Sequence, residues 1–296
     1  MRRAAAACLI AVALPVTAAA QAVAARDDEG TRIALAAPAQ RIVTLAPFLT
    51  EIAFAAGAGA AVAGVAAYSD EPAAARQLPR VGDAARADRE RIAALAPDLV
   101  LAWASGNRRG DIEWLRGRGR GVAVFVAEPR ALDDVARLLR EVGRLAGSEA
   151  GEAAALAFAG SVAQLRARYG SAVPLPVVYE IWPRPLVVAG GRHLIGDAIR
   201  ACGGANVFEH ETALAPAVSL EALAARRPRL VAGGRAAGNG ARAFVEWWQQ
   251  ELARLPGWQP RLAWIDPDLL QRQSPRVLAG VEQLCAAIDA ARRSVD

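Results

Sequence analysis

The chain has 296 residues, of which 54% are hydrophobic and 22% are charged, and its formal net charge at pH 7 is +5. This length allows two domains, and the composition is that of an ordinary globular protein. The positive balance does not indicate a nucleic-acid-binding protein, because the arginines are scattered among acidic residues and no basic run is interleaved with aromatics.

Residues 1–20 have the pattern of a secretory signal peptide. Arg2 and Arg3 precede a short apolar run, and small residues follow it up to Ala20. A membrane anchor is a weaker interpretation because the run is short. Cys8 lies inside the run rather than after it, so we do not interpret it as a lipid-attachment site. We therefore expect an exported, soluble protein, with residues 21–39 as a short N-terminal leader that is extended or loose.

Residues 40–147 are expected to form an N-terminal lobe in which strands and helices alternate. Strands are predicted at 41–46, at 61–67, up to Trp103 and at 121–129, and helices at 48–57 and 131–147. Residues 148–170 follow as one long helical pattern without an interior proline. Such a segment predicts a stiff connecting helix rather than a flexible linker.

Residues 171–296 are expected to form a C-terminal lobe with the same alternation. Strands are predicted at 175–181 and 261–266, and helices at 193–204, 241–257 and 274–293. Ser274 is the expected N-cap of the last helix, with Pro275 at its first position. The predicted fold is therefore α/β, with two Rossmann-like lobes that have mostly parallel sheets and are joined by one long rigid helix.

The two lobes share an internal repeat. "ERIAALAPDLV" (90–100) and "EALAARRPRLV" (221–231) match without a gap, and each follows a good helix N-cap, Asp88 or Ser219. Each copy places a glutamate, Glu90 or Glu221, in the first helical turn, where the helix dipole favours a carboxylate. Ala-rich helices resemble one another easily, but the matching caps favour duplication over coincidence.

Large and polar-tipped side chains fall at the predicted strand ends. Ligands of parallel α/β sheets bind beyond the carboxyl ends of the strands, so these side chains predict a cleft for a flat or bulky ligand between the lobes. The residues concerned are Pro47, Phe48, Thr50, Tyr68, Trp103, Trp182, Asp268 and Arg272. We interpret the other tryptophans as packing residues: Trp114, Trp247, Trp248, Trp258 and Trp264.

Motifs of enzyme chemistry are absent from the sequence. There is no G-x-S-x-G elbow, Walker loop or H-E-x-x-H motif, and neither His193 nor His210 has a spaced partner for a metal site or a triad. We expect each histidine in a loop or at a helix cap. In an exported protein the pair Cys202 and Cys285 predicts a disulfide, with two buried thiols as the alternative.

The strand-end and repeat segments resemble a known family. "RIVTLAPFLTEIAFAAGA", "GVAAYSDEP", "ERIAALAPDLVLAW", "YEIWPRPLVVAGG", "IRACGGANVF", "VSLEALAARRPRLV" and "SPRVLAGVEQLC" are similar to the periplasmic vitamin B12-binding proteins of Gram-negative bacteria. The matches run in order from about residue 41 to about residue 290. This family is a branch of the substrate-binding proteins whose two lobes share a rigid connecting helix.

The resemblance implies a periplasmic monomer that delivers cobalamin to an inner-membrane ABC permease dimer with its ATPase. It implies that Glu90 and Glu221 dock onto arginines of the two permease subunits, and that Cys202 and Cys285 are disulfide-bonded. By residue type, Pro47, Tyr68, Trp103, Asp268 and Arg272 match ligand positions of the family. Ala84 and Ala215 stand where relatives carry tryptophan, and Trp182 is expected to supply stacking area instead. No metal ligand and no catalytic cofactor is implied.

Two other hypotheses about the function stay open. A ferric-siderophore or haem-binding periplasmic protein has the same architecture, and haem usually takes an axial histidine or tyrosine, for which Tyr68 is available. A secreted two-domain α/β enzyme would need a nucleophile and a base that the sequence does not offer. We therefore expect a binding protein rather than an enzyme.

Overall fold

The computed structural model describes residues 21–83, 85–117, 122–235, 239–255 and 257–293. The expected signal peptide at 1–20 and Ala84 lie outside the described residues. Across the described ranges, no helix combines the length and the apolar character needed to cross a membrane.

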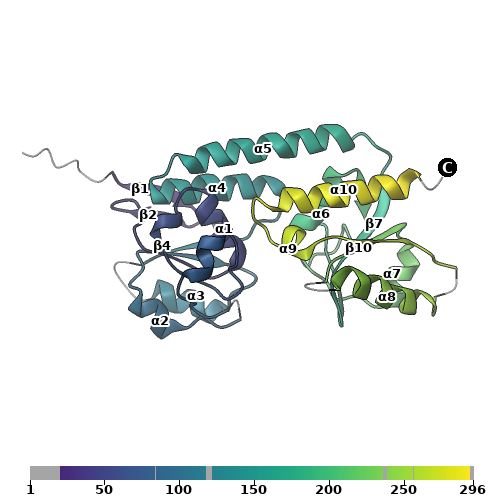
Figure 1. Cartoon of the computed structure of the whole chain (residues 1–296), viewed down its shortest axis with the longest axis horizontal. Coiled ribbons are helices and arrows are strands. Elements are labelled where there is room, and N and C mark those ends of the chain that lie inside the picture. Colours follow the sequence, from purple (N-terminus) through teal and green to yellow (C-terminus); the bar gives the residue numbers. More distant parts are fainter. Residues whose placement is uncertain (1–20, 84, 118–121, 236–238, 256, 294–296) are drawn as a thin grey trace, which may run out of the picture.

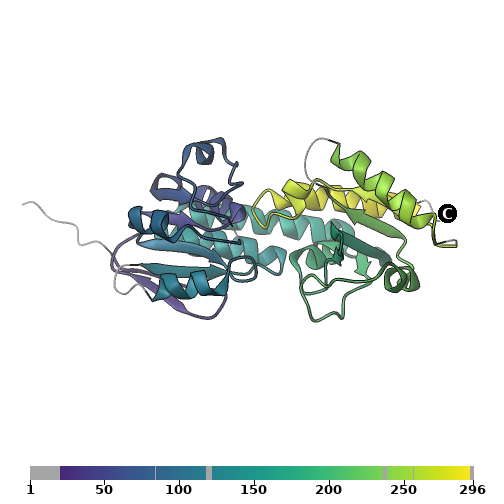
Figure 2. The same cartoon turned by 90° about the horizontal axis from the view of Figure 1, so that it is seen from below.

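Two α/β lobes lie side by side and are joined along one edge by α5 (Ala150–Tyr169), as Figure 1 shows. Seen from the side away from α5, each lobe has a sheet of its own (Figure 2). The expected fold class is confirmed. The long helix falls inside the range 148–170 that the sequence assigned to the connection.

The first lobe is built on a parallel sheet of order β4-β3-β5-β6. Side chains alternate across it, so that Leu99 and Leu101 face one core cluster and Val100 faces another. The strands are β3 (Ile42–Thr44), β4 (Val62–Val65), β5 (Leu99–Trp103) and β6 (Ala123–Ala127). The helices are α1 (Pro47–Ala55), α2 (Arg89–Ala94), α3 (Arg109–Arg116) and α4 (Leu132–Ala146), with short 3-10 turns at Gly59–Ala61 and Ala73–Gln77. Helix α3 was not expected from the sequence.

The second lobe is built on a sheet of order β11-β10-β7-β8, with β9 also paired to β7. Only the β7–β8 pair is antiparallel. The strands are β7 (Leu175–Pro183), β8 (Leu186–Val188), β9 (Gly204–Asn206), β10 (Leu230–Gly233) and β11 (Arg261–Trp264). The helices are α6 (Leu194–Ala201), α7 (Leu220–Arg226), α8 (Gly240–Leu252), α9 (Pro267–Leu270) and α10 (Val277–Arg293). Elements β8, β9 and α9 were not predicted from the sequence, because they are too short to show a periodicity.

The repeat occupies equivalent places in the two lobes. When only the parallel strands of each main sheet are counted, which leaves out β8, the sheet order in both lobes is second, first, third, fourth, and β5 and β10 are the third of these strands. The Asp88 carboxylate accepts from Arg91 N at 3.0 Å, and the Ser219 hydroxyl accepts from Ala222 N at 3.1 Å. Both predicted caps are confirmed, so α2 and α7 begin in the same way and each leads into the strand beside the first strand of its own sheet.

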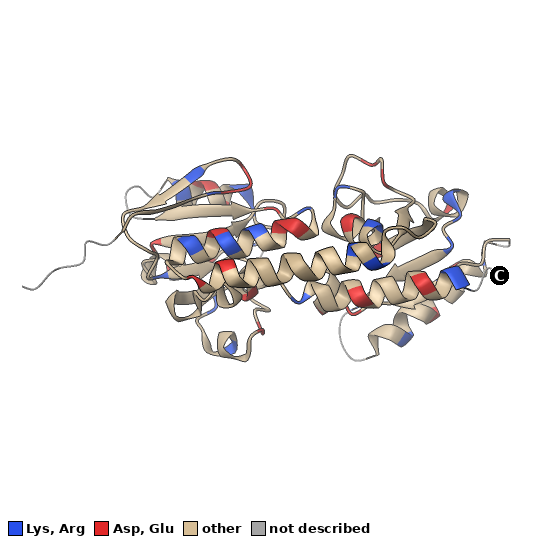
Figure 3. Cartoon of the chain, turned by 90° about the horizontal axis from the view of Figure 1, so that it is seen from above, with Lys and Arg blue, Asp and Glu red and all other residues tan. Residues whose placement is uncertain are grey.

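One core cluster extends through both lobes beneath α5. It contains residues of both sheets and the buried side chains Ala155, Phe158 and Val162 of α5. Helices α4 and α10 lie on either side of α5 (Figure 3). The lobes are also linked by hydrogen bonds, since Asp197 of α6 accepts from Leu132 N at 3.0 Å and pairs with Arg166 at 3.2 Å. The connection is therefore packed over most of its length and is not a free hinge.

The segment 21–39, expected to be extended or loose, forms an ordered hairpin. Strands β1 (Val23–Arg26) and β2 (Arg32–Leu35) pair antiparallel, and Ala25 and Ile33 are buried in the core. The buried carboxylate of Asp27 accepts from Glu29 N at 3.1 Å and Thr31 N at 2.7 Å, which fixes the turn. Residues 27–31 therefore make a turn, and the hydrogen bond from Asp28 N to Val126 O holds it on the first lobe.

The last helix starts later than expected. Helix α10 begins at Val277, and residues 274–276 form a turn before it. Ser274 accepts from Arg276 N at 3.3 Å, but its hydroxyl also donates to Glu51 of the other lobe at 2.6 Å. A contact between the lobes has taken the place of a simple helix cap.

Candidate functional site

Arg272 brings the strand ends of the two lobes together. It follows α9 in the second lobe, and its Nη1 lies 2.5 Å from Asp70 Oδ1 in the loop after β4 of the first lobe. Nη2 lies 3.0 Å from Asp268 Oδ1. Two predicted ligand residues, Asp268 and Arg272, are thus in contact, and both are linked to the loop that carries a third, Tyr68.

Glu51 of α1 is the buried acid of this cluster, with 5% of its surface exposed. Its carboxylate accepts from the Ser274 hydroxyl and lies 3.4 Å from Arg272 and 3.5 Å from Arg276. Burial raises the pKa of the Glu51 carboxyl, and the hydroxyl and the two arginines oppose that rise. In contrast, the hydrogen bond from Arg272 lowers the pKa of Asp70, whose side chain is half exposed.

Glu51 and Asp70 were not among the site residues expected from the sequence. A signal for Glu51 was present, because it is the one acid within the otherwise apolar stretch "FLTEIAFAA". A charged residue at a core position of a helix indicates that a residue from another segment pairs with it in the folded protein. Asp70 lies in a polar loop, where its partner Arg272 stands 202 residues away and leaves no local pattern.

Tyr68 is an exposed aromatic held in a defined loop. Its backbone has φ of 63°, in the left-handed region, and 78% of the residue is exposed. Its carbonyl accepts from Asp70 N at 3.0 Å, and Asp70 in turn is fixed by Arg272. A large ring that is exposed and positioned is suited to stack against a flat ligand.

Trp103 stands at the end of β5 and is partly buried. Its ring meets Phe48 edge to face, with centroids 5.6 Å apart. Its indole Nε1 is buried and has no hydrogen-bond partner among the described residues. Asn107 accepts from Trp103 N at 2.7 Å and so fixes the backbone at the strand end.

Phe48 and Thr50 are buried, whereas Pro47 is partly exposed at the start of α1. The Thr50 hydroxyl lies 2.6 Å from Thr44 Oγ1 and 3.0 Å from Ser69 Oγ, inside the first lobe. Neither buried side chain faces solvent in this structure. Each one instead supports a predicted ligand residue: Phe48 contacts Trp103, and Thr50 holds Ser69 next to Tyr68.

Trp182 projects from the end of β7, with 60% of its surface exposed. Its indole N–H donates to Arg184 O at 3.1 Å, so the turn into β8 orients the ring. Among the tryptophans interpreted as packing residues, Trp248 and Trp258 are buried. Trp114, Trp247 and Trp264 are only partly buried.

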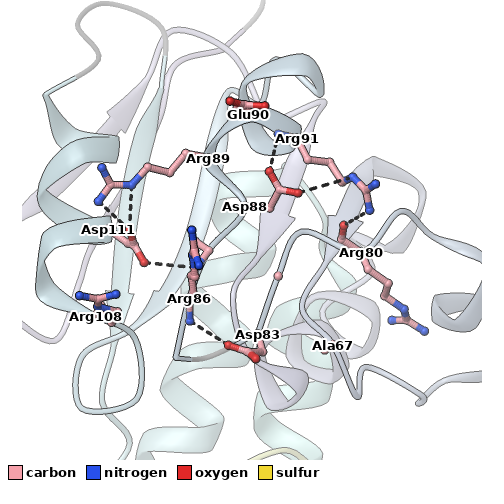
Figure 4. A pocket seen from close by; sticks show the side chains of 12 residues that line it. Ala67, Arg80, Asp83, Arg86, Asp88, Arg89, Glu90, Arg91, Arg108 and Asp111 are labelled. Atoms are coloured by element: carbon pink, nitrogen blue, oxygen red, sulfur yellow. Dashed lines mark hydrogen bonds and ion pairs between the residues drawn. The ribbon is translucent and has the colours of Figure 1, made fainter.

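A concave surface of about 1000 Å³ opens beside α2 in the first lobe (Figure 4). It extends from Ala67, next to Tyr68, to Glu90 at the start of α2. Its wall is held by Arg89, which lies 2.7 Å from Asp111, and by Arg91, which donates to Arg80 O at 2.9 Å. The predicted ligand edge of the first lobe and the predicted docking residue thus border the same hollow.

The repeat glutamates Glu90 and Glu221 are exposed and form no ion pair with any described residue. Helices α2 and α7 lie one on each lobe, on the side away from α5 (Figure 1). Hydrogen bonds from its own amide and from Ser219 lower the pKa of Glu221. The carboxylates of Glu90 and Glu221 are therefore available to an external partner. Ala215 is exposed in the loop that leads to α7.

Cys202 and Cys285 are joined in a disulfide that links the end of α6 to α10. His193 caps α6: its Nδ1 accepts from Ile195 N at 3.1 Å, and burial lowers its pKa to about 4. The expected helix-cap role of His193 is confirmed. Within the ranges that the structure describes, no group of three or more histidine, cysteine or acidic residues is arranged to hold a metal ion.

Two lobes with equivalent sheets, a long connecting helix and polar and aromatic side chains at facing strand ends define a substrate-binding protein. The chain belongs to the periplasmic binding protein family, whose model matches residues 42–259. A vitamin B12-binding protein of Vibrio cholerae is 32% identical over 259 residues, which cover 86% of this chain and 91% of that protein. The sequence-based resemblance is thereby confirmed.

Solved structures agree with this assignment. The crystal structure of the periplasmic vitamin B12 binding protein BtuF of Vibrio cholerae matches with a TM-score of 0.75 and 31% identity, covering 86% of this chain and 98% of that chain. A periplasmic heme binding protein from Pseudomonas aeruginosa matches with a TM-score of 0.70 and 28% identity, covering 84% and 92%. The fold is shared by binders of two different tetrapyrrole-like ligands.

Proposed function

We propose that this protein captures cobalamin or a related corrinoid in the periplasm and delivers it to an inner-membrane ABC permease dimer with its ATPase. The observation that carries the proposal is the exposed Tyr68 ring, tied through Asp70 to Arg272 and Asp268, in a chain about one-third identical to vitamin B12-binding proteins. The N-terminal pattern of a signal peptide supports export.

In the proposed complex the corrin ring lies against the aromatic side chains of the strand ends. Tyr68 and Trp182 offer exposed ring surface, and Trp103 offers the part of its side chain that is not buried. Pro47 adds an apolar contact. Asp268 and Arg272 hydrogen-bond peripheral amides or the nucleotide loop. Trp182 replaces stacking area that Ala84 and Ala215 do not provide.

Phe48 and Thr50 have a supporting role in this proposal. Phe48 sets the angle of the Trp103 ring, and Thr50 fixes Ser69 beside Tyr68. Their substitution should therefore weaken ligand binding indirectly, through the position of an aromatic neighbour.

Docking onto the permease is proposed to use Glu90 and Glu221. Two exposed carboxylates on helices that begin in the same way, one per lobe, suit a partner with two-fold symmetry. Arginines of the two permease subunits would form charge-assisted pairs with them and fix the register of the complex. Catalysis has no part in this proposal, because capture and delivery require no bond to be made or broken.

Haem is the second candidate ligand. The exposed phenol of Tyr68 is available as an axial ligand, and the heme binding protein of Pseudomonas aeruginosa has the same fold. A ferric siderophore fits less well, because an anionic ligand needs converging cations and Arg272 is already surrounded by Asp70, Asp268 and Glu51.

The test is a calorimetric titration of the purified mature protein with cyanocobalamin, haemin and a ferric siderophore. Binding of cobalamin alone, with one site per chain, supports the proposal. Tyr68→Phe sharpens the comparison, because phenylalanine keeps the stacking ring but removes an axial oxygen. Cobalamin binding should survive this change, whereas an axial haem bond would be lost. A protein that binds haemin or the siderophore and not cobalamin contradicts the proposed ligand.

A further inference from the structure

The second lobe contains a small pocket beside Asp268. It measures about 240 Å³ and lies between the end of β11 and the starts of α8 and α9. Arg235, Trp264, Asp266 and Asp268 line it, together with the first two residues of α8. Asp268 places this pocket next to the ion pair with Arg272, and hence beside the proposed ligand.

Two residues that line the pocket, Arg235 and Trp264, each carry a buried hydrogen-bond donor. Trp264 Nε1 and Arg235 Nε are both buried, and neither has a hydrogen-bond partner within the described part of the chain. The Trp264 nitrogen faces the start of α8, since it lies 3.6 Å from the position that a Cβ would take on Gly240. Asn239, the N-cap of α8, makes no side-chain cap. Buried donors of this kind normally have an acceptor, so an acceptor group belongs here.

Two other residues that line the pocket, Asp266 and Asp268, carry carboxylates. Asp268 uses Oδ1 for Arg272, and its side chain is 53% exposed. Asp266 accepts from Asp268 N at 2.9 Å through Oδ1. Each carboxylate therefore keeps a second oxygen that can accept from a ligand N–H.

The positive charge of Arg235 is already neutralised. Its guanidinium lies 3.4 Å from the buried Glu180 and stacks over the Trp247 ring at 5.0 Å. An incoming carboxylate would meet Asp266 and Asp268 without a free cation, and an incoming ammonium would meet the donors. A neutral group that both accepts and donates suits both the donors and the carboxylates.

The volume sets a further limit. Pockets that enclose a whole drug-sized ligand measure roughly 300–1000 Å³, and this one is smaller. It holds a substituent rather than a ring system. We propose that this pocket receives one primary carboxamide of the corrinoid periphery, an inference that rests on the proposed function. Trp264 Nε1 and Arg235 Nε bind the amide oxygen, and Asp268 or Asp266 accepts from the amide nitrogen.

The consequence is specificity at one position of the ligand. A carboxylate in place of that amide loses the donor to the aspartates and gains a repulsive contact, whereas amides elsewhere on the periphery are unaffected. The pocket thereby distinguishes an amidated corrinoid from a tetrapyrrole that carries propionate groups.

The experiment compares cyanocobalamin with its monocarboxylic acid derivatives, each with one peripheral amide converted to a carboxylate, by calorimetry at neutral pH. For the unchanged protein, one derivative should bind at least about tenfold more weakly than the others. Trp264→Phe keeps an aromatic ring but removes the N–H, and it should weaken cobalamin binding about three- to tenfold. It should also reduce the difference between the derivatives. Because Trp264 Nε1 has no hydrogen-bond partner among the described residues, the thermal stability should not fall through a lost hydrogen bond.

Trp258→Phe is the control. Its indole Nε1 donates to Pro228 O at 3.0 Å, and Trp258 does not line the pocket, so its loss should leave cobalamin affinity unchanged. Equal cobalamin affinity of the Trp264→Phe variant and the unchanged protein, or equal affinity of all derivatives, overturns the inference and leaves the proposed function intact. Failure of the unchanged protein to bind cobalamin refutes the proposed function and the inference with it.

Discussion

Arg272 Nη1 lies 2.5 Å from Asp70 Oδ1, so one hydrogen-bonded ion pair joins the second lobe to the loop that carries Tyr68. The same guanidinium lies 3.4 Å from Glu51. The Glu51 side chain is buried, whereas the Asp70 side chain is half exposed. One cation thus serves two carboxylates in different surroundings. Their pKa values move in opposite directions, because burial dominates for Glu51 and the hydrogen bond dominates for Asp70.

Glu51→Gln and Asp70→Asn should show opposite pH dependences of stability. The raised pKa of Glu51 means that its carboxyl contributes most below its ordinary pKa and less as the pH rises through the folded-state value. The lowered pKa of Asp70 means that its contribution is present above its ordinary pKa and is lost as the pH falls. Urea unfolding at about pH 3.5 and about pH 7 measures both. As the pH rises, the unchanged protein should lose stability relative to the Glu51→Gln variant. Over the same range it should gain stability relative to the Asp70→Asn variant. The same sign for both would contradict this account.

Tyr68→Ala should weaken cobalamin binding by roughly tenfold, about 1.4 kcal/mol, because a stacking ring is lost. The free energy of unfolding should change by less than about 0.5 kcal/mol, since the side chain is exposed. Calorimetry and urea unfolding give the two values. Leu156→Ala, which removes another exposed apolar side chain from α5, serves as the control and should leave affinity unchanged. An unaltered affinity of Tyr68→Ala would remove Tyr68 from the proposed site.

Glu90→Gln and Glu221→Gln should impair delivery without impairing capture. Each lost charge removes one pair at the proposed permease interface, with an expected loss of docking affinity of about tenfold or more per site. Cobalamin-dependent stimulation of the ATPase in proteoliposomes measures docking, and calorimetry measures capture. Glu113→Gln and Glu246→Gln are controls, because these exposed acids already pair with Arg109 and Arg242. Normal stimulation by the Glu90 and Glu221 double variant would exclude them as docking residues.

Replacing Cys202 and Cys285 with alanine should lower the free energy of unfolding by about 4.5 kcal/mol in the chain-entropy model, given the separation of 83 residues. Cobalamin affinity should be unchanged, because the bond joins α6 to α10 within the second lobe. Urea unfolding with and without reductant measures the effect. A reductant that destabilises the double variant as much as the unchanged protein would show that the disulfide is not the cause.

The His193 imidazole should titrate with a pKa of about 4 in the folded protein, which NMR can follow directly. Because this value is lowered, the neutral ring contributes stability above its ordinary pKa of about 6.5 and the contribution is lost as the pH falls through about 4. His193→Asn keeps an N-cap acceptor and removes this dependence. An imidazole that titrates near its ordinary value would show that the ring is not held in its buried cap position.

The sequence by itself determined the features that depend on neighbours along the chain. Short apolar, β-branched runs predicted the longer strands, the long uninterrupted helical pattern predicted α5, and Asp88 and Ser219 predicted the starts of α2 and α7. Each rests on local hydrogen bonds or on a periodicity that the backbone imposes, so a single sequence is enough to read it. Strands β8 and β9 and the hairpin at 21–39 were not predicted, because their stability comes from packing against other segments.

Only the tertiary structure decided which predicted site residues are exposed and which are buried. Thr50 and Phe48 follow the first strand of the site as closely as Pro47, yet the turn of α1 directs them into the lobe. Glu51 and Asp70 entered the site because Arg272 reaches them from 221 and 202 residues away. Sequence spacing carries no record of such pairs, because they form only when the two lobes pack and burial makes an unpaired carboxylate costly.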